Sequence, residues 1–163
     1  HFNGDQESYP EVPYSRPDFH GSKVCHTHDF NIHNYSNVKE VRFCRLNGLR
    51  DLDQGKEYVK NMIADLINKL IGWGVAGFRI DAAKHMFPRD LDNISGRLKN
   101  LPTGWFPSGT RPFIFQEVIN LGNGPINNEH YTGRARVTEF KYGFNLGDCF
   151  HKNNAQRDRK SVV

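Results

Sequence analysis

Two acidic residues each follow a short apolar run of this sequence, and their placement suggests chemistry. Asp81 follows the run GVAGFRI, and Glu117 follows the run FIFQ. Because side chains alternate along a strand, Arg79 shares a face with Asp81, where its positive charge attracts the carboxylate. An ionised carboxylate can attack a glycosidic carbon while a protonated carboxyl group donates to the leaving oxygen. The pair therefore predicts glycoside hydrolysis with retention of the anomeric configuration.

The distance between the two acids depends on the strands that carry them. Consecutive parallel strands lie about 4.8 Å apart when they are neighbours, which allows the separation of roughly 5 to 5.5 Å typical of a retaining glycosidase. The spacing alone leaves other readings open, because an acid at the end of a strand also caps a following helix or forms half of an ion pair.

The elements that must position these acids alternate between helix and strand. The predicted elements are, in order, a helix over 57–71, a strand over 75–80, a helix from about 88 to 101, a strand over 113–115 and a strand over 137–142. The first helix carries an apolar face at helical spacing, and Pro102 stops the second one. This alternation is typical of parallel βα units, in which catalytic residues lie at the carboxyl ends of the strands.

Composition excludes several classes of protein. The chain has 163 residues, 37% of them hydrophobic, and this suits one soluble domain. No apolar run of about 18 residues is present, so no bilayer span and no membrane partner are expected. The formal charge of +4 comes largely from the basic residues of 152–163. Nucleic-acid binding is not expected, because no basic stripe with interleaved aromatics occurs elsewhere.

The three cysteines are Cys25, Cys44 and Cys149. A disulfide between the first two would indicate an oxidising compartment, whereas two free buried thiols are the alternative. The run CHTH at Cys25 suggests a zinc site with Cys44, yet no second closely spaced ligand pair completes it. Two glycosylation sequons, at Asn34 and Asn93, are compatible with secretion.

Four stretches of the chain resemble the α-amylases of glycoside hydrolase family 13, particularly the animal type: GFRIDAAKH, FIFQEV, GRARVTEFKYG and VRFCRLNGLRDL. The resemblance runs from near residue 10 to about 146. It implies an α/β fold, a partial (β/α)8 TIM barrel with about strands four to six and part of the inserted, loop-rich B domain. The implied divisions are a calcium-binding B-domain part over 1–52 and a barrel part over 53–150. The ending departs from the family pattern, and residues 151–163 are expected to form a polar, disordered tail; a truncation or a shifted reading frame is the alternative.

The resemblance also implies site residues. Asp81 matches the nucleophile and Glu117 the general acid and base. The residues that match substrate contacts are Lys84, His85, Tyr35 and Ile119. Lys84 can instead be a solvated cation at a helix start, and Tyr35 or Ile119 can serve packing alone.

Two ions are implied by the same resemblance. Calcium would take the Arg42 carbonyl, the Asp51 carboxylate and the His85 carbonyl, although Asp51 can instead cap the helix that follows it. These are the hard oxygen ligands that calcium prefers. Chloride would bind Arg79, with its other ligands downstream of this chain. The alternative is that Arg79 pairs only with Asp81 or Glu117, which would change the pKa values of both carboxyl groups and impair acid catalysis.

The family also pairs cysteines that match Cys25 and Cys44, while Cys149 has no counterpart. The implied protein is a secreted, extracellular enzyme, monomeric at full length, that cleaves internal α-1,4-glucosidic bonds of starch, glycogen and malto-oligosaccharides. An α-glucosidase or transglycosylase of the same family is an alternative, and a glucan-binding protein without catalysis is another.

Further parts of the family pattern are missing from this chain. The matches to one calcium ligand and to a third catalytic acid would lie outside residues 1–163. The chain is therefore expected to be an inactive fragment with two unpaired sheet edges.

Overall fold

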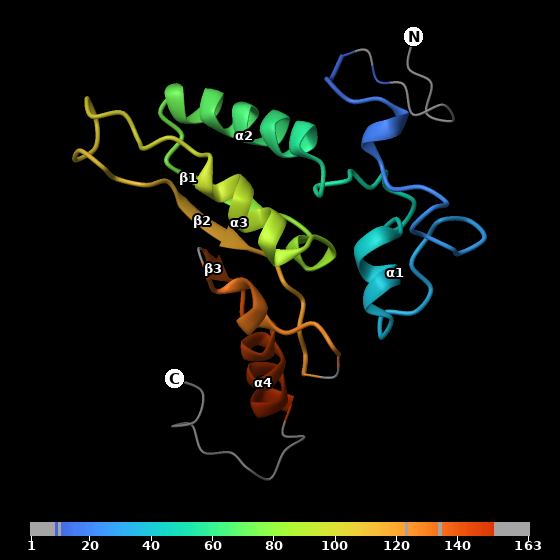
Figure 1. Cartoon of the computed structure of the whole chain (residues 1–163). Helices are drawn as coiled ribbons and strands as arrows, with labels where there is room; N and C mark the ends of the chain where they lie inside the picture. Colours follow the sequence, from blue (N-terminus) through green and yellow to red (C-terminus); the bar gives the residue numbers. More distant parts are fainter. Residues whose placement is uncertain (1–8, 10, 123, 134, 152–163) are drawn as a thin grey trace.

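The computed structural model of the chain shows a small parallel sheet with helices beside it and an irregular N-terminal region to one side (Figure 1). The described residues are 9, 11–122, 124–133 and 135–151. The predicted tail over 151–163 therefore lies, apart from its first residue, outside them. No helix within these residues combines the length and the hydrophobicity needed to cross a bilayer.

The sheet has three parallel strands in the order β1, β2, β3. They span Gly77–Ile80, Phe113–Gln116 and Arg136–Val137. The predicted adjacency of the first two strands is confirmed, with Ile80 opposite Gln116. Strands β1 and β3 are the edges of the described sheet.

The third strand is much shorter than predicted, and the expectation of a strand through residue 142 was wrong. Helix α4 (Phe140–His151) occupies that stretch instead. The Glu139 carboxylate accepts a hydrogen bond from the Lys141 N–H at 2.7 Å. This bond satisfies one of the first N–H groups of the helix, which have no partner within it.

Helices α2 (Glu57–Gly72) and α3 (Pro88–Gly96) lie together along the sheet (Figure 1). The predicted first helix is confirmed within one residue. The apolar residues between helices and sheet form one cluster, whose buried members are Ala64, Ile71, Ile94, Leu98, Leu101 and Ile114. Phe78 and Ile80 of β1 pack against this cluster, so Gly77 and Arg79 face the opposite way.

Helix α3 ends about five residues earlier than predicted. Glycine in a helix costs about 1 kcal/mol relative to alanine, and Gly96 is the last helical residue. The Arg111 guanidinium donates to the Ser95 carbonyl at 2.7 Å and also to the Leu98 carbonyl. The first bond satisfies a carbonyl group at the helix end, and the second satisfies one just beyond it. Leu98 is buried although it lies outside the helix.

The N-terminal region is largely irregular, as predicted, but it contains two short helices that the sequence did not reveal. These are the 3₁₀ helix η1 (Arg16–Asp18) and helix α1 (Val38–Phe43). Asn37 caps α1, because its side-chain oxygen accepts from the N–H groups at the helix start. The predicted disulfide between Cys25 and Cys44 is confirmed, which excludes both cysteines as zinc ligands.

This region is joined to the rest of the chain by backbone pairing. Phe19 and Leu52 form an antiparallel bridge within the region, and the N–H of Asp53, just beyond it, donates to the Asp18 carbonyl at 2.8 Å. Helix α1 packs against the 3₁₀ helix η2 (Ala83–His85), which follows β1. A second core cluster lies at this junction and contains Val41, Ala83, Leu91, Val118, Ile126 and Tyr131.

Candidate active site

The two acids lie side by side because their strands are paired. Asp81 directly follows β1 and Glu117 directly follows β2, one position beyond the paired residues Ile80 and Gln116. The Glu117 N–H donates to the Ile80 carbonyl at 2.9 Å, which extends the pairing by one step. The Asp81 side chain is 70% exposed and that of Glu117 is 19% exposed. One acid is thus open to solvent and the other is sheltered.

A single guanidinium joins the two carboxyl groups. Arg79 contacts Asp81 through Nη1 and Glu117 through Nη2, the second at 2.7 Å. Its hydrogen bond to Asp81, together with the charge of Glu117, raises the pKa of Arg79. The shared face expected for Arg79 and Asp81 is present. Arg79 also shows the pairing with the acids that the sequence left open.

The turn after β1 adds a second link between the strands. Ala82 has a left-handed backbone conformation, with φ of 50°, which costs a non-glycine residue about 1–2 kcal/mol. Its N–H donates to Glu117 Oε2 at 3.2 Å. Each oxygen of the Glu117 carboxylate therefore has a partner on the β1 side, which fixes its orientation.

The residues expected to contact substrate form two neighbouring pairs. Lys84 Nζ donates to the Ile119 carbonyl at 2.8 Å, and burial lowers the pKa of Lys84. The Tyr35 ring meets the His85 ring edge-on, with 6.4 Å between centroids. Tyr35 and Ile119 are 49% and 48% exposed, so in this structure neither serves as core packing.

The residues expected to hold calcium come together from three segments. His85 Nδ1 lies 3.0 Å from the Val41 carbonyl, which is adjacent to Arg42. The charge of Asp51 acts on His85. The Asp51 side chain is only 15% exposed and lies 2.7 Å from Nδ1 of His20. The folded chain therefore brings the irregular region and the turn after β1 to one place.

The charge balance at Asp51 suits a bound cation. Burial raises the pKa of Asp51, even though the hydrogen bond from His20 acts in the opposite direction. The buried carboxylate shares this one imidazole with Asp53, whose Oδ1 lies 3.2 Å from His20 Nε2. Calcium takes carboxylate and carbonyl oxygens, and these are the donor types that Arg42, Asp51 and His85 offer.

Tyr131 is a supporting residue that the sequence did not reveal. It ends the 3₁₀ helix η3 (Asn128–Tyr131), and its hydroxyl lies 3.1 Å from both the Lys84 and the Met86 carbonyls. Only 2% of the residue is exposed, and burial raises the pKa of its hydroxyl to about 12. Gln116 Nε2 donates to the Tyr131 carbonyl at 2.9 Å. No local pattern marks a single tyrosine in a polar loop as such a partner.

Arg42 completes this support with its side chain. The guanidinium donates to the Met86 carbonyl and lies over the rings of Phe87 and Tyr131, 4.9 and 5.4 Å from their centroids. Burial lowers the pKa of Arg42. Its side chain and its carbonyl thus have separate roles, the first in packing and the second as a candidate ion ligand.

Comparisons with known proteins find relatives that match nearly the whole of this chain. No family model matches the chain. The chain is 56% identical over 156 residues to an α-amylase of Oryzias latipes and 51% identical over 157 residues to human α-amylase 1B. Each match covers 96% of this chain, which spans about 30% of the length of these curated relatives.

A solved structure has the same fold over nearly the whole of this chain. The E249Q variant of α-amylase I from Eisenia fetida, in complex with maltohexaose, superposes with a TM-score of 0.94 at 54% identity. The match covers 99% of this chain and 32% of that one. The predicted fold class, part of a (β/α)8 barrel, is confirmed. The proposed division into domains stays a prediction.

Replacing Tyr131 with phenylalanine tests the support of the turn. The Tyr131→Phe variant of the full-length protein loses the donor to two carbonyls, and we expect a loss of about 1–3 kcal/mol in the free energy of unfolding. Urea denaturation measures it as a lower midpoint with an unchanged slope. Tyr142→Phe is the matched control, because Tyr142 is 55% exposed. Equal midpoints for the two variants would contradict this role of Tyr131.

Proposed function

We propose that this chain carries the nucleophile and the general acid/base of an α-amylase, an enzyme that hydrolyses internal α-1,4-glucosidic bonds. The chain matches animal α-amylases and spans about 30% of their length. The observation that supports the proposal best is the contact of one guanidinium with both Asp81 and Glu117. Two acids within reach of one planar group are close enough to act on a single glycosidic bond.

The reaction takes place in two displacements. Asp81, as carboxylate, attacks the anomeric carbon while Glu117 donates its proton to the leaving oxygen, so a covalent glycosyl ester forms and the glycosidic bond breaks. Glu117 then removes a proton from water, which attacks the same carbon and releases Asp81. The two inversions give net retention. Arg79 acts as a positioning residue, since it contacts both carboxyl groups at one edge of the sheet. Because an ion pair favours the carboxylate form, the contact with Glu117 has to open before Glu117 carries its proton.

Starch, glycogen and malto-oligosaccharides are the proposed substrates. The Eisenia fetida enzyme with 54% identity binds maltohexaose in its solved complex, which supports a glucan ligand here. Lys84, His85, Tyr35 and Ile119 are proposed to contact the sugar chain beyond the acids. The exposed tyrosine ring offers an apolar face on which a glucose unit can stack. The disulfide supports a secreted, extracellular protein, because such bonds persist in oxidising compartments.

Calcium is proposed to bind at the Arg42 carbonyl, the Asp51 carboxylate and the His85 carbonyl. When bound, it would supply positive charge beside the buried Asp51 carboxylate, which shares His20 with Asp53. It would also hold the irregular region against the turn that follows Asp81. The chemical steps use only the chain's own acids.

Chloride fits the described residues less well. Both contacts of the Arg79 guanidinium shown in the structure are to carboxylates, whose negative charge opposes an anion at the same place. No step of the mechanism is derived through chloride, and its binding at Arg79 stays a prediction.

Replacing each acid tests the proposed mechanism in the full-length protein. Glu117→Gln should lower kcat on starch by about 10²- to 10⁴-fold, because proton transfer to the leaving oxygen is lost. Asp81→Asn should lower it at least as much, because no glycosyl ester can form. Release of reducing ends from starch measures both. Asp65→Asn, an exposed change on α2, is the matched control and should keep normal kcat.

Three outcomes would count against this assignment. Activity above a tenth of normal in Asp81→Asn would exclude it as the nucleophile. Turnover of short maltosides but not of starch would favour an α-glucosidase or transglycosylase. Maltoside binding without turnover in the unmodified protein would favour a glucan-binding protein without catalysis.

Removing calcium tests the proposed ion site. Chelation with EGTA should lower the thermal midpoint of the full-length protein, because an ion at 100 times its dissociation constant adds about 2.7 kcal/mol of stability. Asp51→Asn should abolish most of this calcium-dependent shift, while Asp65→Asn should keep it. Differential scanning calorimetry with and without calcium measures the shift. An undiminished shift in Asp51→Asn would place the ion elsewhere.

A further inference from the structure

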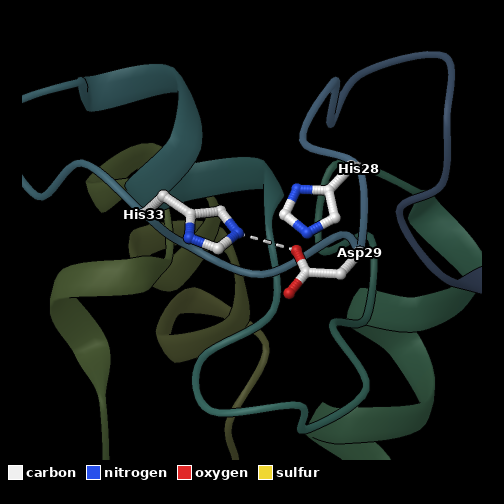
Figure 2. Close-up of side chains that lie close together, drawn as sticks. All are labelled: His28, Asp29 and His33. Atoms are coloured by element: carbon white, nitrogen blue, oxygen red, sulfur yellow. Dashed lines mark hydrogen bonds and ion pairs between the residues drawn. The ribbon is translucent and has the colours of Figure 1, made fainter.

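Three side chains in the loop between Cys25 and helix α1 form a cluster apart from the acids. His28, Asp29 and His33 each present one ligand atom, and these atoms all lie within 4.8 Å of one another. Figure 2 shows both imidazole rings directed toward the Asp29 carboxylate. His33 Nε2 lies 2.8 Å from Asp29 Oδ1. The rings of His28 and His33 are stacked, with centroids 5.2 Å apart.

The backbone that carries this cluster is held by contacts that do not involve the two imidazole rings. The Asp29 carboxylate accepts from the Asn31 N–H at 3.0 Å and from Asn31 Nδ2 at 2.9 Å. The Phe30 carbonyl accepts from the Arg45 N–H at 2.7 Å, and the His33 N–H donates to Glu40 at 3.0 Å. These contacts hold the Asp29 carboxylate and the backbone at Phe30 and His33 in place before any ligand binds.

We propose that His28, Asp29 and His33 bind one divalent transition-metal ion of the zinc, copper or nickel type. Two imidazole nitrogens and one carboxylate oxygen form a donor set of borderline softness, which suits these metals. Calcium prefers a shell of six to eight oxygens, which this cluster does not offer. Three protein ligands leave a fourth position for water, as in open zinc sites.

The geometry needs only small side-chain movements to close around an ion. Metal–ligand bonds of about 2.0–2.2 Å in a tetrahedral site place ligand atoms about 3.4 Å apart. The His33 and Asp29 side chains are 50% and 37% exposed, so they can rotate without disturbing a core. Binding replaces the hydrogen bond between them with two coordination bonds. The proton on His33 Nε2 moves to Nδ1 or leaves to solvent.

This site shares His28 with the zinc arrangement that the run CHTH suggested, but it uses neither of the two cysteines. That arrangement used Cys25 and Cys44, whose sulfur atoms are joined in the disulfide. The site is independent of the proposed function, because none of its ligands is assigned to catalysis or to calcium. His33 nevertheless lies two residues before Tyr35, a proposed sugar contact. The metal site is therefore close in sequence to the proposed substrate cleft.

Titration of Zn²⁺ into the full-length protein with calcium in excess tests the proposal. Isothermal titration calorimetry should show one equivalent bound at this site. His28→Gln and His33→Gln should each weaken that binding at least 10-fold, because even the loss of a partner behind a ligand costs 10- to 100-fold in affinity. His26→Gln, an exposed histidine of the same segment and outside the cluster, is the matched control and should bind normally.

A second measurement separates loss of ligands from loss of fold. The thermal midpoint without Zn²⁺ should be the same in the unmodified protein and in all three variants, because the exchanged rings are not part of a core. Unchanged Zn²⁺ affinity in the double variant His28→Gln, His33→Gln would overturn the proposal. Equal weakening by His26→Gln would also overturn it. The Asp81 and Glu117 variants bear on catalysis alone, so the two proposals fail separately.

Discussion

The parallel pairing of β1 with β2 is the constraint on which the rest of the site depends. Ile80 lies opposite Gln116, and the next residue of each strand is an acid. A shift of the register by one residue would turn one carboxylate to the other face of the sheet. The bond from the Glu117 N–H to the Ile80 carbonyl and the contacts of Arg79 with both acids oppose such a shift.

The parts of the fold that sequence reasoning predicted correctly are those decided by local patterns. Helix α2 follows from an apolar face repeated at helical spacing, and the acids follow from their position after apolar runs. The parts that it missed depend on distant partners. Val137 is the last paired residue of β3, so the apolar alternation beyond it finds no further strand. Helix α3 ends at Gly96, and Arg111 from a later segment donates to the Ser95 carbonyl of the helix and to the Leu98 carbonyl beyond it.

The candidate site shows the same division. Sequence reasoning named the residues of the turn after Asp81 but not the residues that hold that turn. The Tyr131 hydroxyl, from η3, donates to carbonyls of the turn, and the Val41 carbonyl of α1 lies 3.0 Å from His85 Nδ1. His20 was also missed, although it is the partner of the buried Asp51 carboxylate. Such contacts join segments far apart in the chain, and no spacing within one segment signals them.

The central claim is that Asp81 forms a covalent bond to the sugar while Glu117 acts as the general acid and then the general base. The most direct measurement is mass spectrometry of the full-length protein after reaction with a fluorinated α-maltosyl fluoride, which slows release of the glycosyl ester. The account predicts one glycosyl adduct, on the peptide that contains Asp81. An adduct on Glu117 or on another side chain, or turnover of the reagent with inversion and no adduct, would contradict it.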